Sequence, residues 1–443
     1  MLLFNWAIAS YFRHSNPSQL VNMINRIHYF FFLLAFSLPV AAEEIQLALS
    51  SGAEISVSHY QTENPKAVVL WLPTEYGVRG REDATARELN KKGIEVWLAD
   101  LHSSYFIPPG RSSYNNIDTA DISELINKVS HNNRREVTLF ATGRAAPLAL
   151  QAARQLQLNT ASRNTVKSAI LLHPNFYSSA AEAGKSVEYL PITYATNLSL
   201  YIIQPSLSGK LYQLSTIKNH LEKGGSDVIT QVLAEVSDGF NVRTPENQND
   251  ENYYNKTPAI ISGAIDLLAG YEKPRAAAPL PEATATLSTT SGSIKSGLQA
   301  YKGDIKEVYL NFKDFNSLSH TTESHKGEIL LINFWATWCP PCIKELPSLN
   351  RLQDKINDKN FNILAVNIGE KADTVKNFLS PMSIKFPVLT DPQAEAVEPW
   401  KLIAFPSSFI IDKKGVIRYG LFGAIEWDNT DVLEIIRRLL LEE

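Results

Sequence analysis

Trp338-Cys339-Pro340-Pro341-Cys342 contains both cysteines of this chain of 443 residues. Residues 328–335 before it form an apolar run of strand length, and residues 343–356 after it carry apolar side chains at the spacing of a helix face. The cysteines therefore lie at a strand-to-helix junction. We predict that this junction organises the fold of the C-terminal part of the chain.

The spacing of Cys339 and Cys342 is compatible with a small disulfide, a metal site or a pair without function. At a helix N-terminus, unpaired N–H groups and the positive end of the helix dipole favour a thiolate, so we expect Cys339 to be the reactive thiol. Cys342, one turn further on, is expected to be the more buried resolving thiol. Pro340 suits the first helical turn, where its missing N–H costs nothing.

The stretch from Asn333 to Cys342, followed by Glu345 and Pro347, closely resembles the TlpA/ResA-like branch of the thioredoxin superfamily. The resemblance implies a thioredoxin-like fold over residues 298–443. It also implies a thiol-disulfide oxidoreductase whose redox-active disulfide needs no further cofactor. No metal site is expected.

Residues 404–412 resemble the cis-proline strand of the same family. The resemblance implies that Pro406 packs beside the two sulfurs and that the backbone of Phe405 pairs with an incoming substrate peptide. The family more often has a smaller or β-branched residue before this proline. The Phe405 ring therefore either narrows the range of partners, supplies an apolar contact or packs into the core. Residues 395–402, before this strand, are expected to form a helix.

Proton transfer at the resolving thiol needs a nearby base. Asn333 falls where thioredoxins carry a buried carboxylate, and an amide cannot act as a base. Glu345 follows Cys342 by one helical turn, so both lie on the same face, and Glu345 is the candidate proton acceptor. The alternative is an exposed glutamate on the helix surface. Trp338 is expected to shield the site and Trp335 to pack in the core.

Zinc binding is the main competing interpretation of the cysteine pair, because His320 and His325 could complete four ligands. These histidines lie in a polar loop before the strand, whereas the cysteines lie at a helix start among prolines. This context favours exchange chemistry over zinc. A structural disulfide without turnover is the other alternative.

The first 42 residues consist of an N-terminal extension, residues 1–22, and a segment with the layout of a secretory signal peptide, residues 23–42. A short apolar run, Tyr29 to Val40, is preceded by Arg26 and followed by Ala41-Ala42. We expect Met23 to be the initiator and Glu43 the mature start. Export predicts a periplasmic protein of a Gram-negative bacterium, where a chain without spare cysteines avoids mispairing. The alternative is a single N-terminal membrane anchor.

Residues 43–271 alternate apolar strands with amphipathic helices and end in a predicted helix at 258–268, which indicates a parallel sheet covered on both faces. The segment faintly resembles the α/β-hydrolase fold. The turn that would carry the nucleophile has Gly143 in place of serine, and the other two triad positions are also vacant. We predict a pseudo-hydrolase domain for binding or interaction. Arg144 is either a solvated arginine at a helix start or one that holds an anion.

Residues 272–297 are rich in proline, alanine, serine and threonine, which predicts a flexible linker between two domains, 43–271 and 298–443. The apolar fraction of 44% and charged fraction of 20% are ordinary for a folded protein. The net charge of −4 favours neither a nucleic acid nor an anionic membrane surface as a partner.

These patterns favour a periplasmic thiol-disulfide oxidoreductase that reduces substrate disulfides through Cys339 and Cys342. The family resemblance implies protein disulfides as substrates and a membrane thiol protein as electron donor. The same exchange run backwards would oxidise its substrates. The alternative is an exported binding protein whose hydrolase-like domain recognises a partner, with the thioredoxin-like domain as an accessory.

Overall fold

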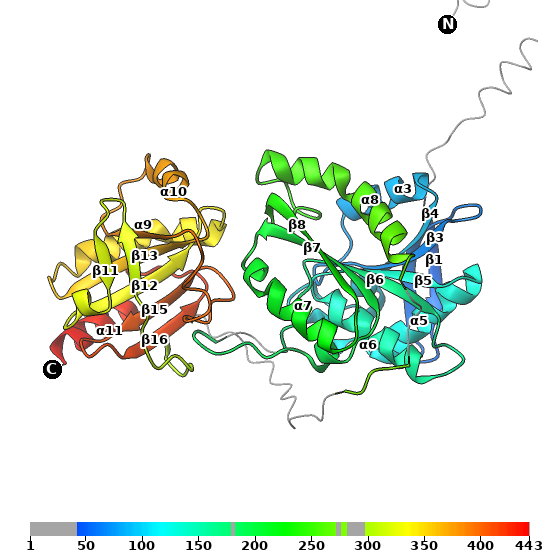
Figure 1. Cartoon of the computed structure of the whole chain (residues 1–443), viewed down its shortest axis with the longest axis horizontal. Helices are drawn as coiled ribbons and strands as arrows, with labels where there is room; N and C mark the ends of the chain where they lie inside the picture. Colours follow the sequence, from blue (N-terminus) through cyan, green and yellow to red (C-terminus); the bar gives the residue numbers. More distant parts are fainter. Residues whose placement is uncertain (1–41, 179–181, 272–275, 281–296, 443) are drawn as a thin grey trace, which may run out of the picture. The chain divides into compact units, whose positions relative to one another are not determined.

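The computed structural model of the chain describes residues 42–178, 182–271, 276–280 and 297–442. These residues form two eight-stranded sheets, one in the N-terminal part and one in the C-terminal part (Figure 1). The expected α/β class is confirmed. The predicted signal peptide and most of the predicted linker lie outside the described residues. Among the residues described, no helix combines the length and hydropathy needed to cross a lipid bilayer.

The first sheet consists of β1 (Glu43–Ala48), β2 (Glu54–Tyr60), β3 (Ala67–Leu72), β4 (Ile94–Asp100), β5 (Val137–Thr142), β6 (Val166–Leu172), β7 (Ser199–Leu207) and β8 (Val228–Ser237). Its strand order is β1-β2-β4-β3-β5-β6-β7-β8. From β4 to β8 neighbouring strands are parallel, as the alternation of strands and helices predicts. The sequence pattern does not predict β1 and β2, and β2 pairs with β4 in the antiparallel direction.

The helices of this part are α3 (Gly80–Lys91), α4 (Leu101–Tyr105), α5 (Thr119–Asn133), α6 (Ala145–Leu158), α7 (Leu214–Lys223) and α8 (Gln248–Leu268), with 3-10 turns η1 (Ser113–Asn116), η2 (Pro191–Tyr194) and η3 (Gly209–Gln213). Figure 1 shows α3 and α8 on one side of the sheet and α5, α6 and α7 on the other. The central strands are therefore covered on both faces, which explains why nearly all of their residues are buried.

The helix α8 begins at Gln248, well before the predicted start at Pro258. The side chain of Asn247 caps it by accepting a hydrogen bond from the Asp250 N–H (3.0 Å). The fully buried Asp250 carboxylate in turn accepts hydrogen bonds from the N–H groups of Ser237 (2.8 Å) and Glu246 (2.9 Å). These polar contacts fix the first half of α8. This half has no apolar periodicity, so the sequence pattern does not predict it.

The second sheet consists of β9 (Gln299–Ala300), β10 (Asn311–Asp314), β11 (Ser319–Thr321), β12 (Ile329–Trp335), β13 (Phe361–Ile368), β14 (Val388–Asp391), β15 (Ser407–Ile411) and β16 (Ile417–Phe422). The strand order is β11-β10-β14-β13-β12-β15-β16-β9. β12, β13 and β14 are parallel, whereas β15 runs antiparallel to β12. The helices are α9 (Pro340–Lys355), α10 (Ala372–Leu379) and α11 (Thr430–Leu441), with the 3-10 turn η4 (Glu323–His325).

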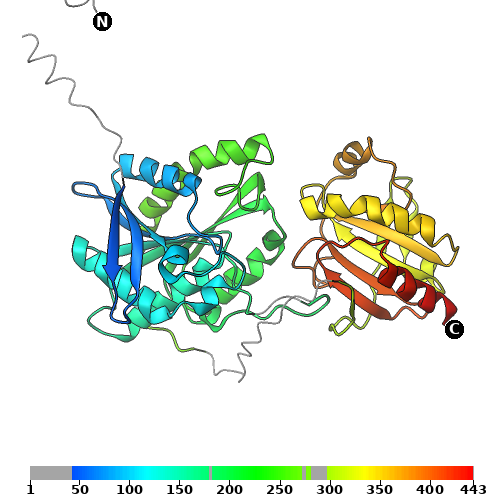
Figure 2. The ribbon, with the colours of Figure 1, turned by 180° about the vertical axis from the view of Figure 1, so that it is seen from behind.

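Every residue of β12 is buried, and its alternating side chains face two different layers. Leu331 and Trp335 pack in the cluster that includes the apolar faces of α9, α10 and α11. Ile332 and Phe334 pack in the opposite cluster with Trp400. Figure 2 shows α9 and α11 lying across the same face of this sheet. The chain therefore leaves β12 from the centre of a sheet that is covered on both faces.

The segment 395–402 is a series of turns, and the prediction of a helix there is wrong. The Asp391 carboxylate at the end of β14 accepts hydrogen bonds from the N–H groups of the first two residues of the segment (2.9 and 2.8 Å). Lys401 has a φ of 52°, which interrupts a right-handed helix. Trp400 is fully buried and donates its indole N–H to the Tyr309 carbonyl (2.8 Å). Long-range anchoring therefore overrides the helical pattern.

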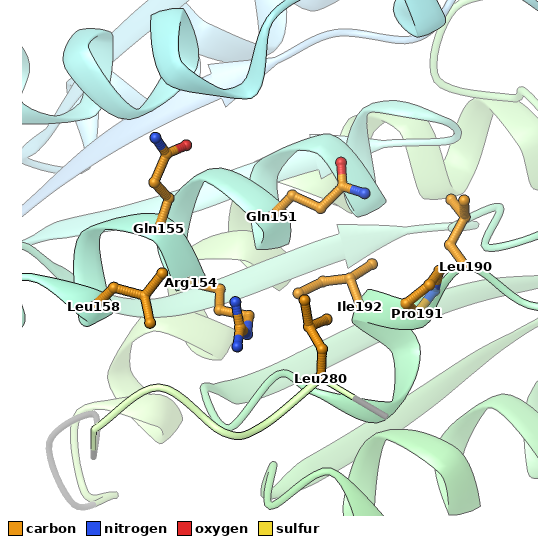
Figure 3. Close-up of a pocket in the computed structure, with 8 residues that line it drawn as sticks. All are labelled: Gln151, Arg154, Gln155, Leu158, Leu190, Pro191, Ile192 and Leu280. Atoms are coloured by element: carbon orange, nitrogen blue, oxygen red, sulfur yellow. The ribbon is translucent and has the colours of Figure 1, made fainter. Parts of the chain in front are cut away.

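Residues 276–280, which belong to the predicted linker at 272–297, lie against α6. The Arg154 guanidinium donates two hydrogen bonds to the Ala278 carbonyl (3.0 and 2.8 Å). Leu280 lines a pocket of about 440 Å³ (Figure 3). The other lining residues are Gln151, Arg154, Gln155, Leu158, Leu190, Pro191 and Ile192.

We expect Asn247→Ala to lower the free energy of unfolding by about 1 kcal/mol, because the Asp250 N–H loses its side-chain acceptor. Asn247→Asp keeps an acceptor and is expected to retain most of the stability. Asn255→Ala, at an exposed position of α8, is the matched control and is expected to be neutral. Urea unfolding followed by circular dichroism measures the change. Equal stability of the two alanine variants would contradict the assigned start of α8.

Candidate redox site

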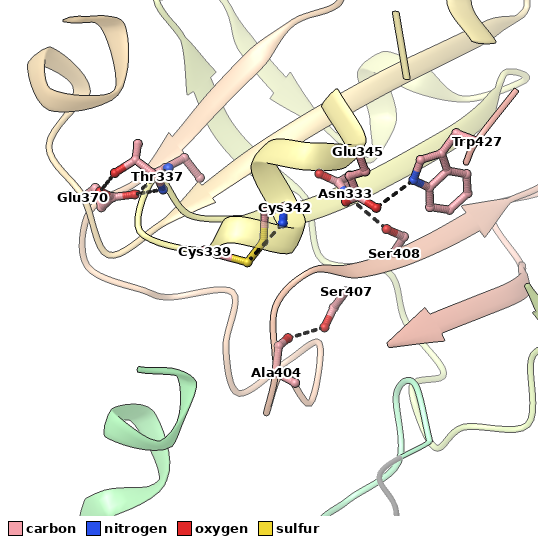
Figure 4. The surroundings of a disulfide bond; sticks show 11 residues. Asn333, Thr337, Cys339, Cys342, Glu345, Glu370, Ala404, Ser407, Ser408 and Trp427 are labelled. Carbon is pink, nitrogen blue, oxygen red and sulfur yellow. Dashed lines mark hydrogen bonds between the residues drawn. A yellow bond between two sulfur atoms is a disulfide. The ribbon is translucent and has the colours of Figure 1, made fainter. Parts of the chain in front are cut away.

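The two cysteines lie where β12 passes into α9 (Figure 4). Cys339 is the N-cap residue of α9, and its Sγ is bonded to the Sγ of Cys342 at 2.00 Å. The Cys339 Sγ also accepts a hydrogen bond from the backbone N–H of Cys342 (3.3 Å). Cys339 is 4% exposed and Cys342 is 0% exposed. The sulfur of Cys339 is therefore the one that a partner reaches more easily.

Pro340 and Pro341 begin α9, and both are exposed. The first N–H groups of a helix have no acceptor within the helix, so prolines at these positions remove no hydrogen bond. The positive end of the α9 dipole lies at Cys339, where it stabilises a negative sulfur. The local sequence thus places a thiolate-stabilising environment directly after a buried strand.

The Phe405–Pro406 peptide bond is cis, as the family resemblance implies. Pro406 is buried, and Figure 4 shows the segment from Ala404 to Ser408 passing beside the disulfide. The half-buried Phe405 ring meets the half-buried Trp338 ring edge to face, with their centroids 5.7 Å apart. Trp335 is fully buried in the core. Phe405 therefore offers part of its ring as an apolar surface next to the site.

Glu345 is buried, 2% exposed, rather than lying on the exposed surface of α9. Its carboxylate accepts hydrogen bonds from Asn333 Nδ2 (2.7 Å) and Trp427 Nε1 (3.0 Å). Asn333 Nδ2 also donates to the Ser408 hydroxyl (3.0 Å). Burial raises the pKa of Glu345 from 4.5 to about 7, although the two donors oppose this shift. One turn after Cys342, the carboxyl group can exchange a proton near neutral pH (Figure 4).

Glu370, which the sequence patterns do not reveal, supports the loop before Cys339. Its carboxylate accepts hydrogen bonds from the backbone N–H (2.7 Å) and hydroxyl (2.5 Å) of Thr337 and from Asn367 Nδ2 (2.8 Å). The parallel pairing of β12 with β13, in which Trp335 lies opposite Asn367, brings these groups together. Only this long-range pairing identifies Glu370, because no local motif marks it.

The two histidines considered for zinc have partners other than the cysteines. His320 Nδ1 lies 2.9 Å from His325 Nε2, and His325 Nδ1 lies 2.6 Å from the Glu328 carboxylate. Within the described part of the chain, no group of three or more histidine, cysteine, aspartate or glutamate residues is arranged to hold a metal ion.

Comparison with known proteins gives matches to part of the chain. Residues 304–420 match the AhpC/TSA family. The thiol-disulfide oxidoreductase ResA of Bacillus thuringiensis is 37% identical over 114 residues, which are 26% of this chain and 60% of that protein. ResA of Geobacillus kaustophilus is 31% identical over 118 residues, which are 27% of this chain and 68% of that protein. The chain thus spans less than two thirds of the first relative and just over two thirds of the second.

Two solved structures are similar to about a third of the chain. StoA of Bacillus subtilis is 23% identical, with a TM-score of 0.27, and the match covers 31% of this chain and 98% of that chain. A thiol:disulfide interchange protein of the thioredoxin family from Chlorobium tepidum is 23% identical, with a TM-score of 0.27, and the match covers 31% of this chain and 99% of that chain.

We expect Glu370→Gln to destabilise the protein by about 1–3 kcal/mol, because the new amide group brings a donor against the donors of Thr337. The loosened loop is also expected to slow the alkylation of Cys339 in the reduced protein. Asp373→Asn removes the same charge at an exposed position of α10 and is the matched control. Urea unfolding and iodoacetamide kinetics measure both effects. A Glu370→Gln variant that behaves like Asp373→Asn would show that Glu370 does not hold the loop.

The raised pKa of Glu345 makes stability depend on pH. The folded state binds the Glu345 proton more tightly than the unfolded state does. The stability that results from this tighter binding is complete below pH 4.5 and is lost as the pH rises through about 7. The loss is about 3 kcal/mol. In Glu345→Gln the dependence disappears, so the variant gains stability relative to the parent across this range.

Unfolding free energies measured between about pH 4 and pH 8 test this expectation. Glu434→Gln, at an exposed position of α11, is the matched control and should follow the parent protein. If the unfolding free energies of Glu345→Gln and the parent protein differed by the same amount at every pH in this range, Glu345 would titrate normally.

Proposed function

We propose that this chain, which belongs through its C-terminal part to the ResA-type thiol-disulfide oxidoreductases, catalyses thiol-disulfide exchange through Cys339 and Cys342. The observation that carries the proposal is the disulfide-bonded pair at the N-terminus of α9, in which Cys342 is more deeply buried than Cys339. This arrangement supports an attacking thiolate at Cys339 and a resolving thiol at Cys342.

In the reductive direction, the Cys339 thiolate attacks one sulfur of a substrate disulfide. A mixed disulfide forms, and the other substrate sulfur leaves as a thiolate that takes up a proton. Cys342 then loses its proton and attacks the Cys339 sulfur, which releases the second substrate thiol and forms the Cys339–Cys342 disulfide. Two electrons pass from the protein to the substrate, one of the two protons taken up by the substrate sulfurs derives from Cys342 and the other from solvent, and an external dithiol restores the reduced protein.

Glu345 is the proposed acceptor of the Cys342 proton, since its raised pKa lets it hold a proton near neutral pH. Asn333 has a positioning role, because its amide donates to the Glu345 carboxylate. The cis Pro406 and the preceding Phe405 form the proposed contact with the substrate peptide. The Phe405 and Trp338 rings would then favour substrates with apolar residues near the disulfide.

We further propose a periplasmic protein that reduces protein disulfides and is recharged by a membrane thiol protein. The export-like first 42 residues and the absence of cysteines beyond the active pair support this location. A reduction potential near or below about −230 mV would support a reductant, whereas a potential near about −120 mV would indicate an oxidant.

The division into domains 43–271 and 298–443, joined by a linker at 272–297, is also a proposal, supported by the two separate sheets. The hydrolase-like character of the first domain is supported by the turn between β5 and α6. Gly143 adopts a φ of 60° there, as a tight strand-to-helix turn requires.

We expect Cys339→Ser to abolish the reduction of insulin disulfides, because the attacking sulfur is lost. Cys342→Ser keeps this sulfur but lacks the resolving thiol, so it is expected to accumulate mixed disulfides with the substrate. A turbidity assay measures turnover, and mass spectrometry without reductant detects the adducts. The double variant is the control and should form none. Wild-type turnover by both single variants would refute the proposal.

A further inference from the structure

Seven polar side chains gather where the parallel strands of the first sheet end. They follow β3, β5, β6, β7 and β8, whose carboxyl ends share one edge, and ligands of open parallel sheets bind at this edge. We call them the carboxyl-edge cluster: Glu75, Arg144, His173, Tyr177, Lys210, Asp238 and Asn241. The cluster is distinct from the cysteine pair, and thiol-disulfide exchange gives it no role.

The turn between β5 and α6 leaves no room for a nucleophilic side chain. A Cβ added to Gly143 would lie 2.6 Å from the Glu75 carboxylate and 3.8 Å from the His173 ring. Glu75 also accepts a hydrogen bond from the backbone N–H of Arg144 (3.2 Å). A carboxylate of the chain itself therefore occupies the N-terminus of α6. The cluster is suited to binding rather than to acyl transfer.

The contacts of Lys210 determine which nitrogen of His173 carries the proton. Lys210 Nζ lies 3.0 Å from the Asp238 carboxylate and 3.4 Å from His173 Nδ1, whereas Asp238 Oδ1 lies 3.3 Å from the same nitrogen without forming a hydrogen bond to it. An ammonium group only donates, so Nδ1 accepts and the proton of the neutral ring lies on Nε2. Burial lowers the pKa of His173, with Asp238 opposing this shift and Lys210 adding to it. The ring is therefore a neutral donor at Nε2.

Several buried donors of the cluster have no acceptor among the described residues. They are His173 Nε2, Arg144 Nε and the Tyr177 hydroxyl. Both side-chain amide atoms of Asn241 and the acceptor Asp238 Oδ1 are also unpartnered. His173 is 5% exposed and Asn241 is 4% exposed. His173 also has a φ of 38°, a strained conformation for a residue with a side chain. Buried polar groups are normally paired, so the three unpartnered donors indicate a missing partner with oxygen acceptors.

The charges around these donors favour an anion. Arg144 and Lys210 each have a carboxylate nearby, and two further cations lie close, because Arg111 influences the pKa of Arg144 and Arg243 that of Asp238. The side chains of Arg144, Lys210 and Asp238 are 23%, 20% and 33% exposed. Solvent therefore reaches the charged groups that surround the buried donors.

We propose that the carboxyl-edge cluster binds a small oxyanion, a carboxylate or phosphate group, whose oxygens accept hydrogen bonds from His173 Nε2, Arg144 Nε and the Tyr177 hydroxyl. Glu75 opposes this binding, because its negative charge lies beside Arg144. The N-terminal part of the chain is then a ligand-binding module, whose activity is independent of the redox pair.

Histidine-selective ¹⁵N NMR of the full chain tests this proposal directly. The Nε2 resonance of His173 is identified by its loss in His173→Gln, and is then followed during titration with inorganic phosphate, acetate or chloride. A saturable shift with phosphate or acetate is expected, and the probe that binds more tightly identifies the class of oxyanion. No saturable shift with either probe, or an equal shift with chloride, would overturn the proposal and indicate that solvent fills the cluster.

Variants then distinguish this site from non-specific anion binding. Arg144→Gln is expected to weaken the binding of the better probe about tenfold, and Glu75→Gln to strengthen it several-fold, since a like charge is removed. Arg154→Gln, on the outer part of α6, removes the same charge as Arg144→Gln and should leave the affinity unchanged. Equal losses in the two arginine variants, or weaker binding in Glu75→Gln, would contradict the proposed site. Glu75→Gln remains informative where Arg144→Gln does not fold.

Discussion

The pairing of β12 with both of its neighbours is the constraint on which the redox site depends. β13 runs parallel to β12, so its end lies beside the end of β12 and brings Glu370 to the loop of Thr337. β15 runs antiparallel, so its start lies at the same place and brings Pro406 there. Cys339 follows β12 directly and begins α9. The pairing of β12 with β13 and with β15 therefore brings residues from distant parts of the sequence to one site.

The same strand places a polar group inside an apolar layer. Asn333 lies in β12 and is fully buried, and it donates to Glu345 of α9. A buried carboxyl group is costly unless donors surround it, and the indole of Trp427 supplies the second donor. These two donors limit the upward shift of the Glu345 pKa and keep it near neutrality. The site thus combines a thiolate-favouring helix end with a buried carboxyl group one turn away whose pKa lies near neutrality.

Local patterns predicted the parts of the fold that depend on neighbouring residues. The apolar run of β12, the motif from Asn333 to Cys342 and the periodic face of α9 all gave their elements correctly, and the resemblance implied the cis bond before Pro406. The first half of α8 and the turns at 395–402 were missed, since buried polar contacts hold both. Glu370 was missed because only strand register brings it to the loop.

In the first sheet, too, local sequence patterns do not show which side chains meet. Gly143 lies in the turn between β5 and α6, but the Glu75 carboxylate beside it follows a different strand, β3. His173 and Asp238 likewise follow different strands and meet only in the folded sheet. In the C-terminal part of the chain, the indole N–H of Trp427 donates a hydrogen bond to the Glu345 carboxylate. The fluorescence of Trp427 is therefore expected to report the ionisation of that carboxyl group without any added label.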